Sequence, residues 1–254
     1  MLARDGVVRL GHGWGFGQLL AAVSVRRRLL ASTQPPTARA ADVNLSAWVS
    51  ERLDTLAWNS GSKIWRRHVD YRGAIPGLEP LLAAIRATVG KMASTYLGND
   101  TSLDGYFALR LPPSLDVANY PAGYYHHDRC GPRLKFYVML TRVTEGTHPL
   151  RVAFGSHRTL YYSHDDMRTS RFTDEFIEAT YDVGSVTGEP GEGFLFDTNA
   201  VHKAGGMGTG FPADGVRDAL VFEFNARGRS RAMCAVDHTL PCGCSEDSAT
   251  TPRS

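Results

Sequence analysis

The chain has 254 residues, of which 43% are hydrophobic and 21% are charged, and its formal net charge is +2. This composition is typical of a globular protein with a full core, and it excludes a low-complexity or fibrous chain. The near balance of acidic and basic residues gives no overall field for binding nucleic acid, and no apolar run is long enough for a membrane-spanning helix.

Cysteine usage and the N-terminal composition bear on the compartment. Three of the four cysteines lie in the last 21 residues, so they do not form a framework that staples the core, and a reducing, intracellular setting is favoured. The first forty residues hold six arginines and one acidic residue, which faintly resembles an organellar transit peptide. Because DGVVRL at 5–10 already has the pattern of a strand, we expect a cytoplasmic protein, with organellar targeting as the alternative.

The first hundred residues are predicted to be mainly helical. Residues 45–58, LSAWVSERLDTLAW, repeat apolar side chains at helical spacing. Residues 79–98, EPLLAAIRATVGKMASTYLG, give the strongest helix signal in the chain, with Pro80 near the first helical position and Gly98 at the C-terminal cap. The apolar face of this second helix is expected to pack on a sheet.

From residue 106 onward the pattern changes to short apolar runs separated by turn residues. These runs, typical of strands, are YFALRL, LKFYVMLTRV, RVAF, GFLFD and ALVFEFN. Between them only 164–181 has the pattern of a short helix, so antiparallel pairing is favoured over a parallel sheet.

The elements together predict a mainly β protein with flanking helices (α+β). Its core would be a double-stranded β-helix, the cupin-like jelly roll, buttressed by the N-terminal helices. We expect one domain over residues 1–230, with a helical part at 1–100 and the jelly-roll core at about 101–230. The small, polar residues of 231–254 predict a disordered tail.

YYHHDRCG, residues 124–131, places two histidines beside an aspartate. Residues two apart on a strand point to the same face, so His126 and Asp128 can reach one point while His127 faces away. One imidazole and one carboxylate are two of the three ligands of a facial iron triad. His202, which follows the strand GFLFD and a polar Asp-Thr-Asn turn, would be the third. A register shift of one residue would exchange His127 for His126.

These ligand types suit a particular chemistry. Two neutral imidazoles and one carboxylate leave Fe(II) with a single net positive charge and three open positions, which a chelating 2-oxo acid and dioxygen can fill. The far carboxylate of such a co-substrate needs a buried cation, for which arginine is well suited. Arg217 begins the strand RDALVFEFN and shares a face with Ala219 and Val221, so it is expected to point inward.

The order of HxD, a strand pair with a GSH turn, GFLFDTNAVH and an arginine-led strand resembles the phytanoyl-CoA dioxygenase-like family of Fe(II)- and 2-oxoglutarate-dependent oxygenases. The resemblance covers residues 103–225, roughly half of the chain. It implies iron binding and catalysis by His126, Asp128 and His202, and 2-oxoglutarate binding by Arg217. The implied reaction consumes O2 and hydroxylates a small organic substrate, with release of succinate and CO2.

Two details refine this expectation. Position 204 is alanine, where a hydroxyl residue often assists the co-substrate carboxylate, so Tyr137 or Lys135 on the strand 134–143 is expected to help instead. Related halogenases lack the carboxylate ligand, so the presence of Asp128 favours oxygen insertion over halogenation.

Other interpretations stay open at this point. The same ligands would serve a cupin-like metal-dependent oxygenase that uses no 2-oxoglutarate. A catalytically silent barrel would only bind a ligand or partner, and a zinc or manganese hydrolase is a weaker third alternative. A zinc knuckle from Cys234, His238, Cys242 and Cys244 is disfavoured by its short span and single cluster. His157 in FGSHR is expected to be structural.

Arginines are dense between residues 129 and 171. A solvated face is the simpler explanation, and the functional alternative is an anionic substrate such as a CoA ester or another phosphate-bearing molecule. The segment 156–190 is the expected substrate-selecting lid, because long insertions between core strands tend to carry specificity. No nucleic-acid partner is expected, and the oligomeric state is unknown from the sequence.

Overall fold

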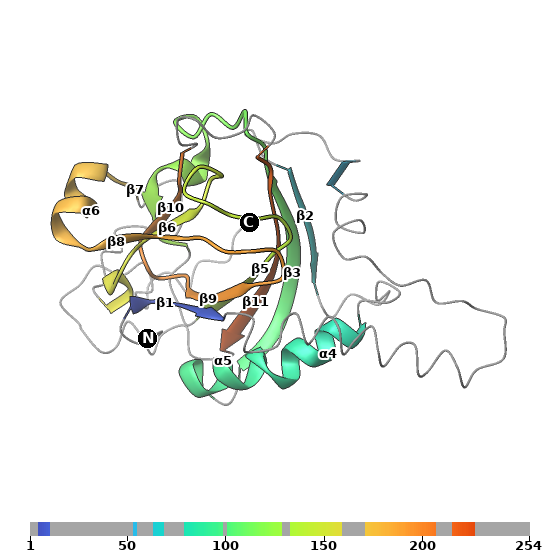
Figure 1. The fold of residues 1–254 in the computed structure, drawn as a ribbon. Coiled ribbons are helices and arrows are strands. Elements are labelled where there is room, and N and C mark those ends of the chain that lie inside the picture. Colours follow the sequence, from blue (N-terminus) through green and yellow to red (C-terminus); the bar gives the residue numbers. More distant parts are fainter. Residues whose placement is uncertain are drawn as a thin grey trace, which may run out of the picture.

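The computed structural model of the protein describes residues 5–10, 53–54, 63–68, 79–98, 101–128, 133–158, 171–206 and 215–226. Within these ranges the strands form two sheets (Figure 1), and neighbouring strands in each sheet are antiparallel. The predicted mainly β architecture is thereby confirmed, and two facing antiparallel sheets are consistent with a jelly roll. The predicted tail at 231–254 and the four cysteines lie outside the described residues.

The larger sheet has six strands. Their order is β1 (Val7–Leu10), β9 (Gly193–Asp197), β5 (Arg133–Met139), β11 (Arg217–Ala226), β3 (Thr101–Leu111) and β2 (Lys63–His68). Side chains alternate between the faces of β11, so Leu220 and Phe222 join the core under the helices while Ala219 and Val221 join the core between the sheets. The predicted inward face of this strand is confirmed.

The smaller sheet has five short strands. Their order is β7 (Arg171–Phe172), β4 (Tyr125–His126), β10 (His202–Ala204), β6 (Leu150–Ala153) and β8 (Val183–Val186). Its inner face contributes Val152 and Val186 to the core that β3, β5 and β9 also line. The pocket described below opens within this inter-sheet core.

The helices cover the sheets from outside. α4 (Glu79–Ala87) and α5 (Val89–Leu97) run along the larger sheet, and α6 (Asp174–Thr180) lies beyond the smaller one (Figure 1). The single helix predicted over 79–98 is divided at Thr88, whose hydroxyl donates a hydrogen bond to the carbonyl of Ala84 at 2.8 Å. Such back-bonding by a β-branched residue bends helices. Gly98 closes α5 with φ of 117° and donates its N–H to Ser94 at 2.9 Å, as the sequence predicts.

Other predicted elements differ in extent. β5 ends at Met139 rather than at residue 143, and Val143 pairs with Gly188 in an isolated bridge. The helix expected within 164–181 is α6, whose N-cap Thr173 accepts a hydrogen bond from the N–H of Phe176 at 3.2 Å. The helix expected at 45–58 lies outside the described residues apart from Leu53 and Asp54, which are helical. No helix in the part of the chain described here is long and apolar enough to cross a membrane.

Candidate active site

Three buried polar side chains, His126, Asp128 and His202, meet at the inner face of the smaller sheet. Each offers one ligand atom, and these atoms lie within 4.8 Å of one another. His126 on β4 and His202 on β10 are direct cross-strand partners, with ring centroids 4.4 Å apart. Asp128 follows β4, where its N–H donates to the carbonyl of Thr198 at 3.0 Å. The sequence-predicted triad is therefore assembled in space, and its donor set is that of a facial Fe(II) site.

Both histidines are oriented by the carbonyl group two residues earlier in the chain. Nδ1 of His126 lies 2.7 Å from the oxygen of Tyr124, and Nδ1 of His202 lies 2.8 Å from the oxygen of Ala200. A carbonyl oxygen only accepts, so each Nδ1 carries a proton, and in a neutral ring the lone pair that can bind a metal is then on Nε2. Burial, followed by the nearby His126, lowers the pKa of His202 to about 3, so this imidazole is neutral at neutral pH.

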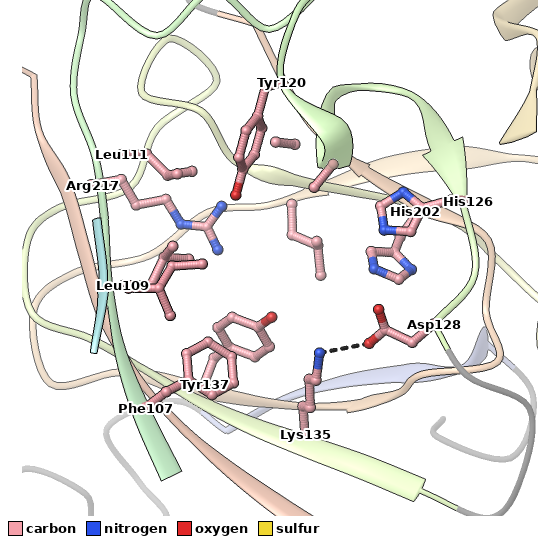
Figure 2. A pocket seen from close by; sticks show the side chains of 14 residues that line it. Phe107, Leu109, Leu111, Tyr120, His126, Asp128, Lys135, Tyr137, His202 and Arg217 are labelled. Atoms are coloured by element: carbon pink, nitrogen blue, oxygen red, sulfur yellow. Dashed lines mark hydrogen bonds and ion pairs between the residues drawn. The ribbon is translucent and has the colours of Figure 1, made fainter. Parts of the chain in front are cut away.

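Asp128 is held by two cations that contact the same carboxylate oxygen. Lys135 donates to Oδ2 at 2.6 Å, and the guanidinium of Arg133 lies 3.3 Å from the same atom. Burial acts to raise the pKa of Asp128, but the positive charges of Lys135 and Arg133 outweigh it and hold this pKa well below its usual range. Figure 2 shows the other oxygen, Oδ1, on the side of the two imidazoles. The carboxylate is thus ionised, with one oxygen on the side of the two histidines.

The triad forms one end of a pocket whose volume is about 580 Å³ when the part open to solvent is counted. Its walls include the apolar side chains Phe107, Leu109 and Leu111 of β3. The guanidinium of Arg217, from the start of β11, lies at the opposite end from the triad (Figure 2). A mostly apolar cavity with convergent polar groups is the usual form of a small-molecule site.

Arg217 is a buried cation, with only 3% of its surface exposed. Its Nη1 donates to the carbonyl of His148 at 2.6 Å, and its guanidinium carbon lies 5.9 Å from the centre of the Tyr137 ring. Among the described residues no carboxylate forms a salt bridge with it, and burial lowers its pKa. A buried charge without a counter-ion is costly, so this end of the pocket is suited to an anion.

The residues predicted to assist Arg217 occupy different places. Lys135 and Tyr137 both line the pocket from β5, as strand alternation predicts. Lys135 contacts Asp128 at the triad end, whereas Tyr137 reaches toward Arg217. Attraction by Asp128 outweighs the effect of burial and raises the pKa of Lys135, so this ammonium group is charged.

His127 and His157 are both buried and neither lines the pocket. Nδ1 of His127 contacts the carbonyl oxygen of Asp128, so this side chain points away from the triad as its position on the strand predicts. His157 belongs to a short 3-10 turn, Ser156–Arg158. The predicted register, with His126 and not His127 in the triad, is therefore the one that the chain adopts.

Sequence reasoning missed Tyr120 and His148. Tyr120 lines the pocket from the turn before the 3-10 helix Pro121–Gly123, and Figure 2 shows its hydroxyl oxygen near the guanidinium of Arg217. His148 bonds Arg217 through its backbone carbonyl. Both residues stand in turns, where no periodic pattern indicates which way a side chain points.

The dense arginines divide between the site and the surface. Arg133 contacts Asp128, whereas Arg142 pairs with Glu189 at 2.9 Å and Arg151 pairs with Glu178 at 3.2 Å. Arg129 and Arg168 are outside the described residues, as is 159–170 of the expected lid. The two surface pairs fit the solvated-face interpretation for those arginines.

No protein-family model matches the sequence, and no curated protein is significantly similar to it. Solved structures do match, at low identity. The epimerase SnoN in complex with Fe3+, alpha ketoglutarate and nogalamycin RO has a TM-score of 0.55 at 16% identity, covering 88% of this chain and 80% of that chain. The non-heme alpha ketoglutarate dependent carbocyclase SnoK from nogalamycin biosynthesis has a TM-score of 0.54 at 15% identity, covering 88% and 81%.

A third match is EctD from S. alaskensis with 2-oxoglutarate and 5-hydroxyectoine, with a TM-score of 0.51 at 18% identity over 89% of this chain and 73% of that chain. The fold of the protein is therefore that of non-heme iron, 2-oxoglutarate-dependent enzymes. At this identity the likeness concerns the fold, and function has to be argued from the site itself.

Proposed function

We propose that the protein is a non-haem oxygenase dependent on Fe(II), 2-oxoglutarate and O2, of the phytanoyl-CoA dioxygenase-like kind. One observation carries the proposal: a pocket with a His-Asp-His triad at one end has a buried arginine without a described counter-ion at the other. A 2-oxo acid with a second carboxylate has the complementary ends. Its oxo acid group would bind at the triad, and its distal carboxylate would neutralise Arg217.

The chain's own groups have separate tasks in this proposal. The two histidines would present their Nε2 atoms and Asp128 a carboxylate oxygen, so that together they would hold Fe(II). Lys135 and Arg133 keep that carboxylate ionised. When bound, the iron would supply the oxidation of 2-oxoglutarate and substrate by dioxygen.

The far end of the pocket would fix the co-substrate. Arg217 would pair with the distal carboxylate, and the hydroxyl groups of Tyr120 and Tyr137, which also line the pocket, would donate to it in place of the hydroxyl that Ala204 lacks. The apolar wall of β3 would exclude water around the carbon chain, which strengthens each of these electrostatic contacts.

We further propose hydroxylation of a small organic substrate as the outcome. Asp128 would supply a protein carboxylate to the metal, which would leave fewer positions open for a halide. An anionic substrate, such as a CoA ester or phosphate-bearing molecule, would be attracted by Arg133, which is 20% exposed beside the triad. The reaction would take place in the cytoplasm.

The test is anaerobic titration of the purified protein with Fe(II), with and without 2-oxoglutarate, following the visible absorption of the chelate. We expect the absorption to require both components. In Arg217→Met the affinity for 2-oxoglutarate should fall at least about a hundredfold, because a charge-assisted contact is lost and the distal carboxylate of the co-substrate is left unpaired. Arg151→Met, which removes an arginine from a surface pair with Glu178, is the matched control and should bind normally.

The same titration separates the alternatives. If Fe(II) binds but 2-oxoglutarate gives no chelate absorption, the cupin-like oxygenase without a 2-oxo acid becomes the better assignment. If the protein binds no metal, the silent barrel does. In either case the proposed function is wrong.

A further inference from the structure

His148 occupies a strained position at the arginine end of the pocket. Its side chain is fully buried and its φ is 52°, in the left-handed region, where it is the one non-glycine residue of the described chain. Non-glycine residues adopt this conformation rarely, and they persist there when the surrounding structure fixes them. Pro149 follows and is also buried, so the residue has little freedom on its C-terminal side.

The imidazole of His148 joins two strands that would otherwise end separately. Nδ1 lies 3.0 Å from the carbonyl oxygen of Gly205, just after β10, and Nε2 lies 3.0 Å from that of Pro112, just after β3. Gly205 also donates its N–H to Pro149 at 2.7 Å, and a Cβ at Gly205 would come within 3.1 Å of that proline. The absence of a side chain at Gly205 therefore permits this close junction.

The backbone carbonyl of His148 holds a third element, because it accepts the hydrogen bond from Nη1 of Arg217 at 2.6 Å. We infer that His148 is a positioning residue for the co-substrate: its ring fixes the junction of β3 and β10, and its carbonyl thereby aims the guanidinium of Arg217 into the pocket. This inference rests on the proposed function and adds a residue that acts through Arg217 without touching the co-substrate.

Protonation of the ring is tied to this junction. A carbonyl oxygen only accepts hydrogen bonds, so a neutral imidazole satisfies one of its two partners, and an imidazolium satisfies both. Burial is the largest effect on the pKa of His148 and lowers it, and the charge of Arg217 lowers it further. The charge of Arg217 acts on the ring, which also faces the backbone carbonyls of Pro112, Pro113 and Gly205.

An anion bound to Arg217 offsets the charge that opposes protonation of His148. Binding of the distal carboxylate and protonation of the ring therefore favour each other, by linkage. The preference for a co-substrate that has a distal carboxylate should rise as the pH falls toward the pKa of His148, whereas a 2-oxo acid without that group should show no such change.

The experiment compares 2-oxoglutarate with 2-oxopentanoate, which has the same oxo acid group and no distal carboxylate. Their dissociation constants are measured by anaerobic calorimetry on the full-length, Fe(II)-loaded protein and on His148→Asn, since asparagine tolerates the left-handed region and lacks the ring. We expect 2-oxoglutarate to bind about tenfold more weakly to the variant, as for the loss of a buried hydrogen-bonded anchor, and 2-oxopentanoate to bind within about twofold of the unaltered protein. His157→Asn replaces a buried histidine that does not line the pocket, and it should change neither dissociation constant.

Equal weakening of both ligands would mean that His148 has a purely structural role, and it would overturn the inference. If the asparagine variant does not fold, the same affinity ratio is measured in the unaltered protein from about pH 7.5 down to about pH 5, because the pKa of His148 is lowered from its usual value. A ratio that rises with falling pH supports the inference, and a constant ratio overturns it. Failure of the unaltered protein to bind 2-oxoglutarate at all would overturn the proposed function and this inference together, whereas normal binding with an unchanged ratio in the variant would overturn this inference alone.

Discussion

Replacing Lys135 by methionine should destabilise the metal-free protein and strengthen its affinity for metal. The Lys135 ammonium lies 2.6 Å from Oδ2 of Asp128, and both side chains are about nine-tenths buried. In the metal-free protein this contact neutralises a carboxylate that has been removed from water. For a bound Fe(II), the same ammonium is a nearby like charge. The two effects of its removal therefore have opposite signs.

The structure sets the size of each effect. Removing one partner of a buried ion pair costs about 3–5 kcal/mol, and Arg133, 3.3 Å from the same oxygen, should reduce this to about 2–3 kcal/mol in Lys135→Met. For a domain of this size that corresponds to a fall in melting temperature of roughly 4–12 °C. Loss of the like charge should tighten metal binding at least about tenfold, since a positive charge next to a metal ligand opposes binding of a divalent cation by more than about 1.4 kcal/mol even where it is strongly screened.

Differential scanning calorimetry of the metal-free protein and anaerobic Fe(II) titration without co-substrate give the two quantities. Lys203→Met is the matched control: Lys203 pairs with Asp174, whose side chain is 53% exposed, and it stands next to His202 on β10, so it projects from the opposite face of that strand. That variant should bind metal normally. If folded Lys135→Met binds Fe(II) more weakly, the lysine holds Asp128 in ligand geometry and does not compete with the metal, and the reasoning above is wrong.

Three further predictions concern the stability of the protein and the backbone that positions His202. Tyr96→Phe should lower the free energy of unfolding in urea by about 1–3 kcal/mol, because the tyrosine hydroxyl donates to the fully buried Asp197 at 2.8 Å; Tyr124→Phe, at a 40% exposed position, should cost under about 0.5 kcal/mol. Ser156→Ala should weaken Fe(II) binding, since the serine Oγ accepts the N–H of the residue before His202 at 2.8 Å, and unchanged affinity in a titration would contradict this. The pKa of His202 is lowered to about 3 in the folded protein, so below about pH 6.5 the unfolded chain binds a proton that the folded protein does not. The metal-free protein should therefore be fully stable above about pH 6.5 and lose up to about 1.4 kcal/mol of stability per pH unit below it. A melting temperature that is flat from about pH 7 to about pH 5 would refute this.

Strand parity allowed much of the site to be predicted from the sequence. A strand has a period of two, so one core residue on a strand identifies all the residues that point inward. This rule places Lys135 and Tyr137 on the inward face of β5, and Arg217 on the inward face of β11. The triad could be predicted in the same way, from His126 and the polar turn before His202. Local pattern and residue chemistry are sufficient where backbone geometry is regular.

The remaining features depend on contacts that are distant in sequence. That Lys135 would bond Asp128 rather than a co-substrate follows from the convergence of β4 and β5, which no local pattern specifies. Tyr120 and His148 enter the site from turns, and their directions depend on which strands the turns connect. The division of the helix at Thr88 is a competition between one side-chain hydrogen bond and the helix ladder, which composition alone does not resolve.

The two ends of the pocket are built on elements of very different extent. Arg217 belongs to a ten-residue strand paired along most of its length with a neighbour on each side, whereas the two histidines stand on strands of two and three residues. Amide hydrogen exchange should therefore be slowest in β11, where it would follow global unfolding, and faster around β4 and β10, which can open locally. A bound metal would then join β4 to β10 and oppose their local opening. Metal binding should therefore slow amide exchange in β4 and β10 far more than in β11.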